Sequence, residues 1–275
     1  MMAYSRKYKQ VFFAGKRNVF IFEKCENKTW QYEVIVLSLI MKRLIGLDLD
    51  GTLTQHRSPL DAVHRELLDA IGGKYKIIIV AAGNAPRVFA QMGQYPIDII
   101  ANYGMQESRM IDGRFTIVRD DKVFPDRASF IRKADYLRRK YGYTDYVGDS
   151  LEFHESGMVT FPLLGTKADI NDKISFDPDR SKRHLMYPEV KELFKGWSVF
   201  VGGTSSFDFT PEQYNKYDAM IHYGAEHGYS RDEMLYVGDD FGDGGGDSDI
   251  RLGGMDYIAV EDYRKLAEKL KYLLS

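Results

Sequence analysis

The chain has 275 residues, of which 44% are hydrophobic and 13% aromatic, and its 38 Lys and Arg residues nearly balance its 40 Asp and Glu residues. This composition is ordinary for a soluble globular protein with a substantial core. The formal net charge of -2 gives no indication of a nucleic-acid or membrane-surface partner. The single cysteine, Cys25, excludes an internal disulfide, and the longest apolar run (34–41) is too short to span a bilayer. We therefore expect a cytoplasmic protein.

The first 40 residues are aromatic and basic and show no clear period, whereas Met41 is followed at once by a convincing buried strand. We interpret residues 1–41 as an extension without an assigned function. Our hypothesis is that Met41 is the functional start and that the residues before it are dispensable.

Beyond Met41, patterns typical of strands and helices alternate. Residues 44–49 are apolar on both faces, as in a central strand of a parallel sheet. The other elements predicted in this part are strands at 76–81 and 97–101, a helix that begins at Ser58–Pro59, and a helix from about Pro86. This order predicts a doubly wound, mostly parallel, Rossmann-like α/β sheet.

The middle of the chain changes character, because short strand patterns and helices succeed one another without regular alternation. Asp126 is a candidate N-cap for a helix that ends at Gly142. We therefore predict an inserted α+β domain at 119–208. The alternation then returns with a helix to Gly228, a capping box at Ser230–Glu233, strands at 234–238 and 257–260, and a final helix.

Two carboxylates come directly after the first predicted strand. Asp48 and Asp50 are two positions apart, which keeps both on one side of an extended chain with about 6.5–7 Å of rise between them. Reactive groups in open α/β sheets gather just beyond the carboxyl ends of the strands. Gly51 permits a sharp turn whose backbone N–H groups face an anion, and Thr52 adds a hydroxyl donor. The stretch predicts a phosphoryl or metal site at this edge of the sheet.

A second acidic group lies after a later predicted strand. Asp239 and Asp240 come directly off that strand, and Asp243 and Asp247 are reached through a glycine-rich loop. Near Asp48 these carboxylates would repel one another by about 4 kcal/mol for each pair of charges ~4 Å apart at an effective dielectric near 20. A divalent cation cancels that repulsion, and oxygen ligands without nearby Cys or His favour Mg²⁺ over zinc. A single calcium-binding turn is the alternative, but such repeats occur in tandem.

An acidic pocket with a nucleophilic aspartate is suited to phosphoryl transfer. A carboxylate can attack phosphorus and form an aspartyl-phosphate, while a cation and a lysine neutralise the charge that develops. Lys216 lies on the helix that leads into the second acidic strand and is our candidate for that lysine.

The order and content of these motifs resemble the haloacid dehalogenase (HAD) superfamily and, within it, the phosphomannomutase branch. The stretches that carry the resemblance are "DLDGTLT" (48–54), "LEFHESGMVTFPLLG" (151–165), "SFDFTPEQYNKYDAM" (206–220) and "GDDFGDGGGD" (238–247). The resemblance covers residues 42–275. It implies a catalytic core at 42–118 and 209–275 and a cap domain for substrate specificity at 119–208.

The resemblance also implies roles for individual residues. Asp48 would be the nucleophile and Asp50 the general acid/base. Mg²⁺ would be held by Asp48, the Asp50 carbonyl and Asp239, with Asp243 or Asp247 completing its shell. The substrate would be a phosphorylated small molecule, and the resemblance leaves a homodimer open.

The chain departs from the branch at its phosphate-binding positions. Gly83 and Asn84 stand where the branch has a Ser-Asp pair, and His154 and Thr166 stand where it has two cap arginines. The expected phosphate and substrate contacts that remain are Gly51, Thr52, Gly83, Asn84, Arg57, Ser206 and Asp208, and Lys167, Arg180 or Arg183 could take the place of the missing arginines.

A phosphatase needs a binding site only for the phosphate that it removes, whereas a mutase must also bind a distal phosphate. We therefore favour a Mg²⁺-dependent sugar-phosphate phosphatase over a phosphomannomutase. A remote alternative of another class is a receiver-like phospho-switch, which also combines an acidic pocket with a lysine but is smaller and lacks an insertion of this size.

Overall fold

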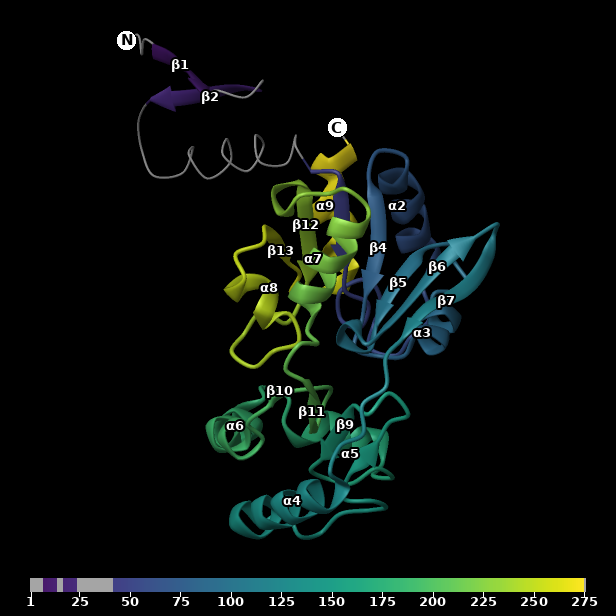
Figure 1. Ribbon diagram of the computed structural model, residues 1–275, viewed down its shortest axis with the longest axis vertical. Coiled ribbons are helices and arrows are strands. Elements are labelled where there is room, and N and C mark those ends of the chain that lie inside the picture. The colour runs from purple at the N-terminus through teal and green to yellow at the C-terminus, as the bar shows by residue number, and fades with distance from the viewer. Residues whose placement is uncertain (1–6, 14–16, 24–41, 275) are drawn as a thin grey trace. The chain divides into compact units, whose positions relative to one another are not determined.

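The computed structural model describes residues 7–13, 17–23 and 42–274, and the chain divides into two compact units, 1–41 and 42–275 (Figure 1). In the first unit, β1 (Lys7–Phe13) pairs with β2 (Arg17–Glu23) in antiparallel register. This strand pair was not predicted, because the segment shows no clear alternation. Met41 lies outside the described residues, so the hypothesis that it is the functional start stays a prediction.

The second unit is built on a seven-stranded sheet of order β13-β12-β3-β4-β5-β6-β7. Its strands are β3 (Leu44–Leu47), β4 (Lys76–Val80), β5 (Asp98–Ala101), β6 (Gln106–Ile111), β7 (Arg114–Asp120), β12 (Met234–Gly238) and β13 (Tyr257–Ala259). The strands from β13 to β5 run parallel, and β6 and β7 add an antiparallel edge. The prediction of a mostly parallel α/β sheet is therefore confirmed. Its central strands are buried on both faces, which explains their continuous apolar runs.

Helices accompany this sheet, and their apolar faces fill its core. The helical elements are α2 (Ala62–Gly72), α3 (Ala85–Gln91), α7 (Lys216–Glu226), α8 (Ser248–Leu252) and α9 (Leu266–Leu270), with single turns η1 (Asn102–Gly104), η2 (Arg231–Glu233), η3 (Tyr263–Lys265) and η4 (Lys271–Leu274). Met220 and Tyr223 of α7 join a buried cluster with Leu44, Ile78 and Tyr236 from three strands of the sheet. No described helix is long and apolar enough to cross a membrane.

The predicted start of the first helix at Ser58–Pro59 is wrong. Helix α2 begins at Ala62, and Asp61 is its N-cap, because its Oδ1 accepts the His64 N–H at 2.9 Å. The backbone before it is tied to another part of the fold, since the Leu60 N–H donates to the Gln91 carbonyl at 3.0 Å. The cap at Asp126 and the capping box at Ser230–Glu233 are confirmed.

A second, four-stranded antiparallel sheet of order β10-β11-β9-β8 lies within the inserted segment. Its elements are α4 (Arg127–Tyr141), β8 (Glu152–Phe153), β9 (Val159–Pro162), α5 (Ile170–Phe176), α6 (Ser181–Leu193), β10 (Trp197–Phe200) and β11 (Ser206–Pro211). It has its own aromatic core, in which Phe130 and Phe194 both pack against Phe209. Its role as a cap stays a prediction.

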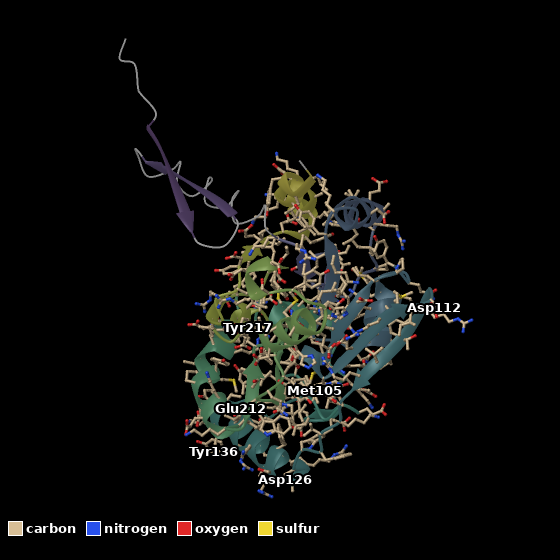
Figure 2. All side chains as sticks on the ribbon, turned by 45° about the horizontal axis from the view of Figure 1, so that its top comes forward. Met105, Asp112, Asp126, Tyr136, Glu212 and Tyr217 are labelled. Atoms are coloured by element: carbon tan, nitrogen blue, oxygen red, sulfur yellow. The ribbon has the colours of Figure 1, made fainter. Side chains whose placement is uncertain are left out.

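The second sheet lies beyond the carboxyl ends of the core strands (Figure 1). The two connecting segments are joined where the Tyr214 hydroxyl donates to Asp121 at 3.0 Å. Tyr103 stacks on Phe200 with ring centroids 4.2 Å apart. Met105, labelled in Figure 2, belongs to the same small buried cluster. The space between the sheets is therefore partly packed, and what remains open forms a pocket.

Candidate active site

A cavity of about 400 Å³ lies between the carboxyl edge of the core sheet and the second sheet. Charged side chains from both parts line it, including Asp48, Asp50, Lys216, Asp239, Asp240 and Arg180. Four acidic residues predicted from two distant stretches thus open onto one cavity: Asp48, Asp50, Asp239 and Asp240.

The pairing of β3 with β12 explains why these stretches meet. The two strands are parallel neighbours, with Leu47 opposite Val237, so their carboxyl ends lie at the same edge. The Asp48 N–H extends this ladder by donating to the Val237 carbonyl at 2.9 Å. Asp48 and Asp239 therefore leave adjacent strands at the same edge of the sheet.

Three carboxylates form a tight cluster, and one ammonium group pairs with two of them. Asp48, Asp239 and Asp247 each offer an oxygen, and these oxygens lie within 4.8 Å of one another. The Lys216 Nζ donates to Asp48 at 2.8 Å and to Asp247 at 2.7 Å, and it is almost fully buried. With all groups ionised, three negative charges face one positive charge, which leaves two negative charges uncompensated.

Asp247 is the organiser of this cluster. One of its oxygens accepts Lys216 and also the Tyr236 hydroxyl at 2.7 Å, and the other accepts the N–H groups of Asp239 at 3.1 Å and Asp240 at 3.0 Å. Four donors on a fully buried carboxylate fix the loop after β12. Asp48 and Asp239 accept fewer hydrogen bonds than Asp247. Each has only one oxygen with a side-chain donor among the described residues.

Asp243 lies apart from the cluster. Its side chain is 89% exposed, and one oxygen accepts the Arg251 guanidinium at 2.9 Å. Of the two loop residues predicted for the metal, the geometry brings Asp247 to Asp48 and Asp239 and leaves Asp243 at the surface.

The pKa values of the cluster are set by burial and like charge. Burial raises the pKa of Asp48 well above its usual value, and the nearby carboxylates of Asp247 and Asp239 raise it further against the opposing effect of Lys216. The pKa of Asp239 is raised for the same reasons, burial first and Asp247 second. Burial lowers the pKa of Lys216, but its two carboxylate partners outweigh this effect and raise it. The lysine is therefore held charged, while the carboxylates lack full compensation.

Asp50 has a different environment from Asp48. Its Oδ1 accepts the Arg57 N–H at 2.6 Å and the Gln91 amide at 2.8 Å, and its Oδ2 lies 3.4 Å from the Arg87 guanidinium. Burial raises the pKa of Asp50, but these hydrogen bonds outweigh it and lower the pKa overall. The two aspartates of the first motif are thus tuned in opposite directions.

Gln91 and Arg87 were not predicted from the sequence. They lie one turn apart on α3, and the Arg87 Nη1 donates to the Gln91 Oε1 at 2.8 Å. Their spacing on the helix was the signal in the sequence that could have identified them. This helix follows β4, the strand next to β3, so it begins at the edge of the sheet where Asp48 and Asp50 lie.

The turn after Asp50 is closed on itself. The Gly51 N–H donates to the Thr54 carbonyl at 2.8 Å, so this donor does not face an anion as predicted. What Gly51 provides is a left-handed backbone (φ 96°) and room, since a Cβ there would lie 2.7 Å from an Asp239 oxygen. Thr52 is fully buried and donates its hydroxyl to Asp239 at 3.0 Å. This turn therefore positions Asp239.

Gly83 and Asn84, predicted to contact phosphate, do not line the cavity. The Asn84 side chain accepts the Arg87 N–H at 2.9 Å as the N-cap of α3. Gly83 lies under the Arg87 guanidinium, where a Cβ would be 2.0 Å from the nearest nitrogen. The pair therefore helps Arg87 to reach Asp50, and a contact with phosphate stays a prediction.

The remaining predicted contacts lie on both sides of the cavity. Asp208 lines it, accepts the Thr160 hydroxyl at 2.7 Å, and has a pKa raised by burial. His154 contacts the same hydroxyl at 2.9 Å. The Ser206 hydroxyl donates to the Gly202 carbonyl at 3.0 Å, and the Arg57 side chain is exposed. Of these residues, Asp208 is the one brought into the cavity.

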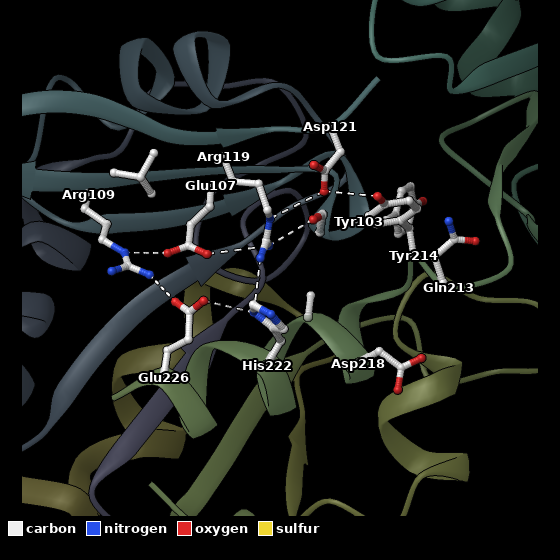
Figure 3. Close-up of a pocket in the computed structure, with 13 residues that line it drawn as sticks. Tyr103, Glu107, Arg109, Arg119, Asp121, Gln213, Tyr214, Asp218, His222 and Glu226 are labelled. Atoms are coloured by element: carbon white, nitrogen blue, oxygen red, sulfur yellow. Dashed lines mark hydrogen bonds and ion pairs between the residues drawn. The ribbon is translucent and has the colours of Figure 1, made fainter. Parts of the chain in front are cut away.

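A second charged cavity, of about 520 Å³, lies between β6, β7 and α7 (Figure 3). There Glu107 is almost fully buried between Arg109, at 2.6 Å, and Arg119, at 3.5 Å. Arg109 also donates to Glu226, and Arg119 contacts His222 at 3.1 Å. The charges of Glu107, Glu226, Arg109 and Arg119 are paired with one another, in contrast to the acidic cluster.

The acidic cluster fits a divalent cation of the hard type. Its ligands are carboxylate oxygens, and no described His or Cys takes part in it. Such oxygen donors suit Mg²⁺, and two uncompensated negative charges match its charge. The residues that would hold it are Asp48 and Asp239, in a frame fixed by Asp247.

Comparison with known proteins supports the resemblance seen in the sequence. No family model matches the chain. It is 26% identical over 186 residues to phosphomannomutase 2 of Dictyostelium discoideum, covering 64% of this chain and 74% of that protein. It is 24% identical over 240 residues to phosphomannomutase 1 of the same organism, covering 83% and 90%.

Solved structures with the same fold include an N-terminally truncated, IMP-bound IMP-nucleotidase of Plasmodium falciparum, with a TM-score of 0.60, 13% identity, and coverage of 90% of this chain and 73% of that one. A HAD superfamily phosphatase of Bacteroides thetaiotaomicron matches with a TM-score of 0.55, 16% identity, and coverage of 85% and 95%. The chain has the fold of these HAD superfamily structures, and the curated proteins to which its sequence is similar are named phosphomannomutases.

Proposed function

We propose that this HAD-fold protein is a Mg²⁺-dependent phosphatase that acts on a sugar phosphate or a similar small phosphomonoester through an aspartyl-phosphate on Asp48. The observation that carries the proposal is the cluster of three carboxylates, Asp48, Asp239 and Asp247, of which two pair with Lys216, so that two negative charges lack compensation when all groups are ionised. At separations within 4.8 Å, each pair of like charges costs about 3 kcal/mol or more at an effective dielectric near 20. A fold that retains such repulsion is poised to bind a cation.

In the first step, an Asp48 oxygen attacks phosphorus while the bond between phosphorus and the ester oxygen breaks. Lys216 holds the other oxygen of Asp48 at 2.8 Å, which fixes the direction of attack. The bound Mg²⁺ would supply neutralisation of the phosphoryl oxygens and of the acidic cluster.

Asp50 is the proposed proton carrier. Its protonated form gives a proton to the leaving oxygen, and the resulting carboxylate then takes a proton from water as that water attacks phosphorus and releases Asp48. The contacts from Gln91 and the Arg57 N–H hold the carboxylate in one orientation and favour its ionised form. The same contacts therefore support its second task, as a base.

Phosphomannomutase is the second candidate, because curated relatives of the chain carry that name. A mutase holds both phosphates of a bisphosphate, and two positions that resemble the family's cap arginines here hold His154 and Thr166. The Thr166 hydroxyl accepts the Asp149 N–H at 2.8 Å, and His154 contacts Thr160, so neither side chain replaces an arginine. This difference favours the phosphatase. A cytoplasmic location and a homodimer stay predictions.

Turnover of p-nitrophenyl phosphate tests the proposal. We expect multiple turnovers that require Mg²⁺ and are abolished by EDTA. At most one equivalent of product would indicate a receiver-like switch and would contradict the proposal.

Incubation with mannose 1-phosphate and a hexose bisphosphate separates the two enzyme candidates. Release of free phosphate supports the phosphatase, whereas accumulation of the 6-phosphate isomer supports the mutase. The proposed chemistry on Asp48 is common to the phosphatase and the mutase. This experiment therefore tests only whether water or a sugar hydroxyl accepts the phosphoryl group.

A further inference from the structure

Tyr103 lies just beyond the carboxyl end of the third core strand and lines the cavity around Asp48. β5, which ends two residues before Tyr103, belongs to the same parallel run of strands as β3 and β4. The carboxyl ends of these strands share one edge of the sheet. Tyr103 also lines the second charged cavity (Figure 3), so its ring separates the two cavities.

The backbone that carries Tyr103 has an uncommon conformation. Asn102, Tyr103 and Gly104 are all left-handed, with φ of 48°, 55° and 99°. Residues with a Cβ rarely adopt this conformation, and where they do the surrounding structure holds them in it, often at a functional site. The Asn102 N–H donates to the Gly83 carbonyl at 3.0 Å, and the Met105 N–H donates to the Asn102 carbonyl at 3.1 Å. The fold therefore maintains a strained turn that presents this tyrosine.

The Tyr103 ring is held between the core and the second sheet. It stacks on Phe200 of β10, with ring centroids 4.2 Å apart and planes 3° apart. Tyr103 is only 2% exposed. A buried ring that is fixed by stacking holds its hydroxyl at one place.

The hydroxyl end of this ring lies beside the acidic cluster. A Cβ at Gly246 would lie 3.8 Å from the Tyr103 hydroxyl oxygen and 3.9 Å from the Lys216 Nζ, so these two groups flank the same point. Lys216 in turn donates to Asp48 at 2.8 Å. Gly246 keeps this space free of a side chain, next to the carboxylate that is proposed to receive the phosphoryl group.

The Tyr103 hydroxyl has no hydrogen-bond partner among the described residues. Burial raises the pKa of Tyr103 well above its usual value, and the nearby charges of Asp208, Asp240, Asp48 and Asp247 raise it further. The hydroxyl therefore keeps its proton and acts as a donor. A buried donor without an acceptor costs about 1–3 kcal/mol, and an oxygen of a bound molecule would remove that cost.

Nearby donors on the core side of the cavity are engaged by acceptors of the protein itself. The Lys216 ammonium pairs with two carboxylates, and the Thr52 hydroxyl donates to Asp239. The Gly51 N–H is bonded within its own turn. The Tyr103 hydroxyl differs from all three, because its acceptor must come from a bound molecule.

We propose that the Tyr103 hydroxyl donates a hydrogen bond to a non-bridging oxygen of the phosphoryl group as this group passes to Asp48 and then to water. The O–H bond of the tyrosine stays intact in both steps, so the hydroxyl stabilises negative charge on the phosphoryl oxygens and exchanges no proton. Because this donor is neutral, it leaves the negative charge of the acidic cluster available to the cation. The inference rests on the proposed function and adds a catalytic residue to it.

Tyr103→Phe removes the hydroxyl and keeps the ring that stacks on Phe200. With saturating Mg²⁺ we expect kcat/KM to fall by about tenfold to a hundredfold, because a hydrogen bond to a charged group is lost. The loss should be similar for p-nitrophenyl phosphate and glucose 6-phosphate, since the two share the phosphoryl oxygens and differ in the leaving group. Unchanged kcat/KM would overturn the proposal. So would a loss confined to one substrate, which would place the hydroxyl on the leaving group.

Inhibition by orthovanadate provides a second measurement, because bound vanadate resembles the phosphoryl group during transfer. In Tyr103→Phe we expect the inhibition constant to rise by about the factor by which kcat/KM falls. A fall in kcat/KM with unchanged inhibition would show that the hydroxyl only supports the fold, and this result would overturn the inference.

Tyr214→Phe is the matched control. Tyr214 packs against the same small buried cluster as Tyr103, but its hydroxyl donates to Asp121 at 3.0 Å and it lines the second charged cavity. Turnover should stay within about twofold of the wild type, whereas a loss equal to that of Tyr103→Phe would show that the joint between the sheets is responsible. Absence of wild-type turnover with every phosphomonoester would instead contradict the proposed function, so the two failures are distinguishable.

Discussion

Two charged cavities of the second unit, one around Asp48 and one around Glu107, contain similar residue types and differ in how the charges are compensated. Around Glu107, the carboxylates of Glu107 and Glu226 each have arginine or histidine partners, and the contacts form a closed network (Figure 3). Around Asp48, three carboxylates lie close together, and one lysine pairs with two of them. The cavity around Glu107 is the larger of the two, at about 520 Å³ against about 400 Å³ for the cavity around Asp48. Size therefore does not identify the reactive site, whereas uncompensated charge does.

The difference has a physical reason. A paired network needs no ligand to offset its charge, because its positive and negative groups largely compensate one another. An acidic cluster with a net charge is stable only when another interaction offsets its repulsion, and a ligand can supply that interaction. The network between β6, β7 and α7 is therefore interpreted as structural, and the cluster at the edge of β3 and β12 as functional.

Replacing one carboxylate by an amide in each cavity should reveal the largest functional difference between the two cavities. In Asp48→Asn, turnover of p-nitrophenyl phosphate should fall by about 1,000-fold or more, because the amide cannot form the acyl phosphate. In Glu226→Gln, turnover should stay within about twofold of the wild type. Steady-state kinetics with saturating Mg²⁺ measures both, and a loss of similar size in the two variants would show that the cavities are not functionally distinct.

Removal of one cation from each cavity should differ in its effect on stability. Without Mg²⁺, Lys216→Met leaves buried carboxylates unpaired and should lower the free energy of unfolding by about 3 kcal/mol. Arg109→Met should cost about 1 kcal/mol, because Arg119 still faces Glu107 at 3.5 Å. Urea denaturation in EDTA provides the comparison, and a larger loss in Arg109→Met would contradict it.

The pH dependence of the paired network should be the smallest effect. The hydrogen bond from Arg109 lowers the pKa of Glu226 against the opposing effect of burial. A lowered pKa contributes stability that is present above the unfolded value, about 4.3, and is lost as pH falls through the folded value. Because Glu226 is 42% exposed, the contribution should be less than about 1 kcal/mol. Thermal unfolding from pH 6 to pH 3 should show a shallower decline in Glu226→Gln, and identical slopes would argue against this ion pair.

The core sheet and the convergence of its acidic ends could be predicted from the sequence. Continuous apolar strands indicate a parallel sheet, and the residues that come directly after parallel strands lie together at its carboxyl edge. The alternation of elements and the cap at Asp126 rest on equally local signals.

Loop geometry and side-chain contacts could not be predicted in the same way. Asp243 and Asp247 have similar sequence surroundings, and only the folded loop turns Asp247 toward Tyr236 while Asp243 meets Arg251. Asn84 could be expected as a phosphate contact or as a helix cap, and the structure shows the cap, whereas the phosphate contact stays a prediction. Such choices depend on tertiary neighbours that a single sequence does not reveal.

Calorimetric titration of Mg²⁺ into three forms of the metal-free protein tests the central claim most directly. The account predicts one Mg²⁺ site in the wild type, retained in Asp243→Asn and lost or weakened at least tenfold in Asp239→Asn. Equal affinity in all three forms, or loss in Asp243→Asn alone, would contradict the claim that the metal binds where β3 and β12 end.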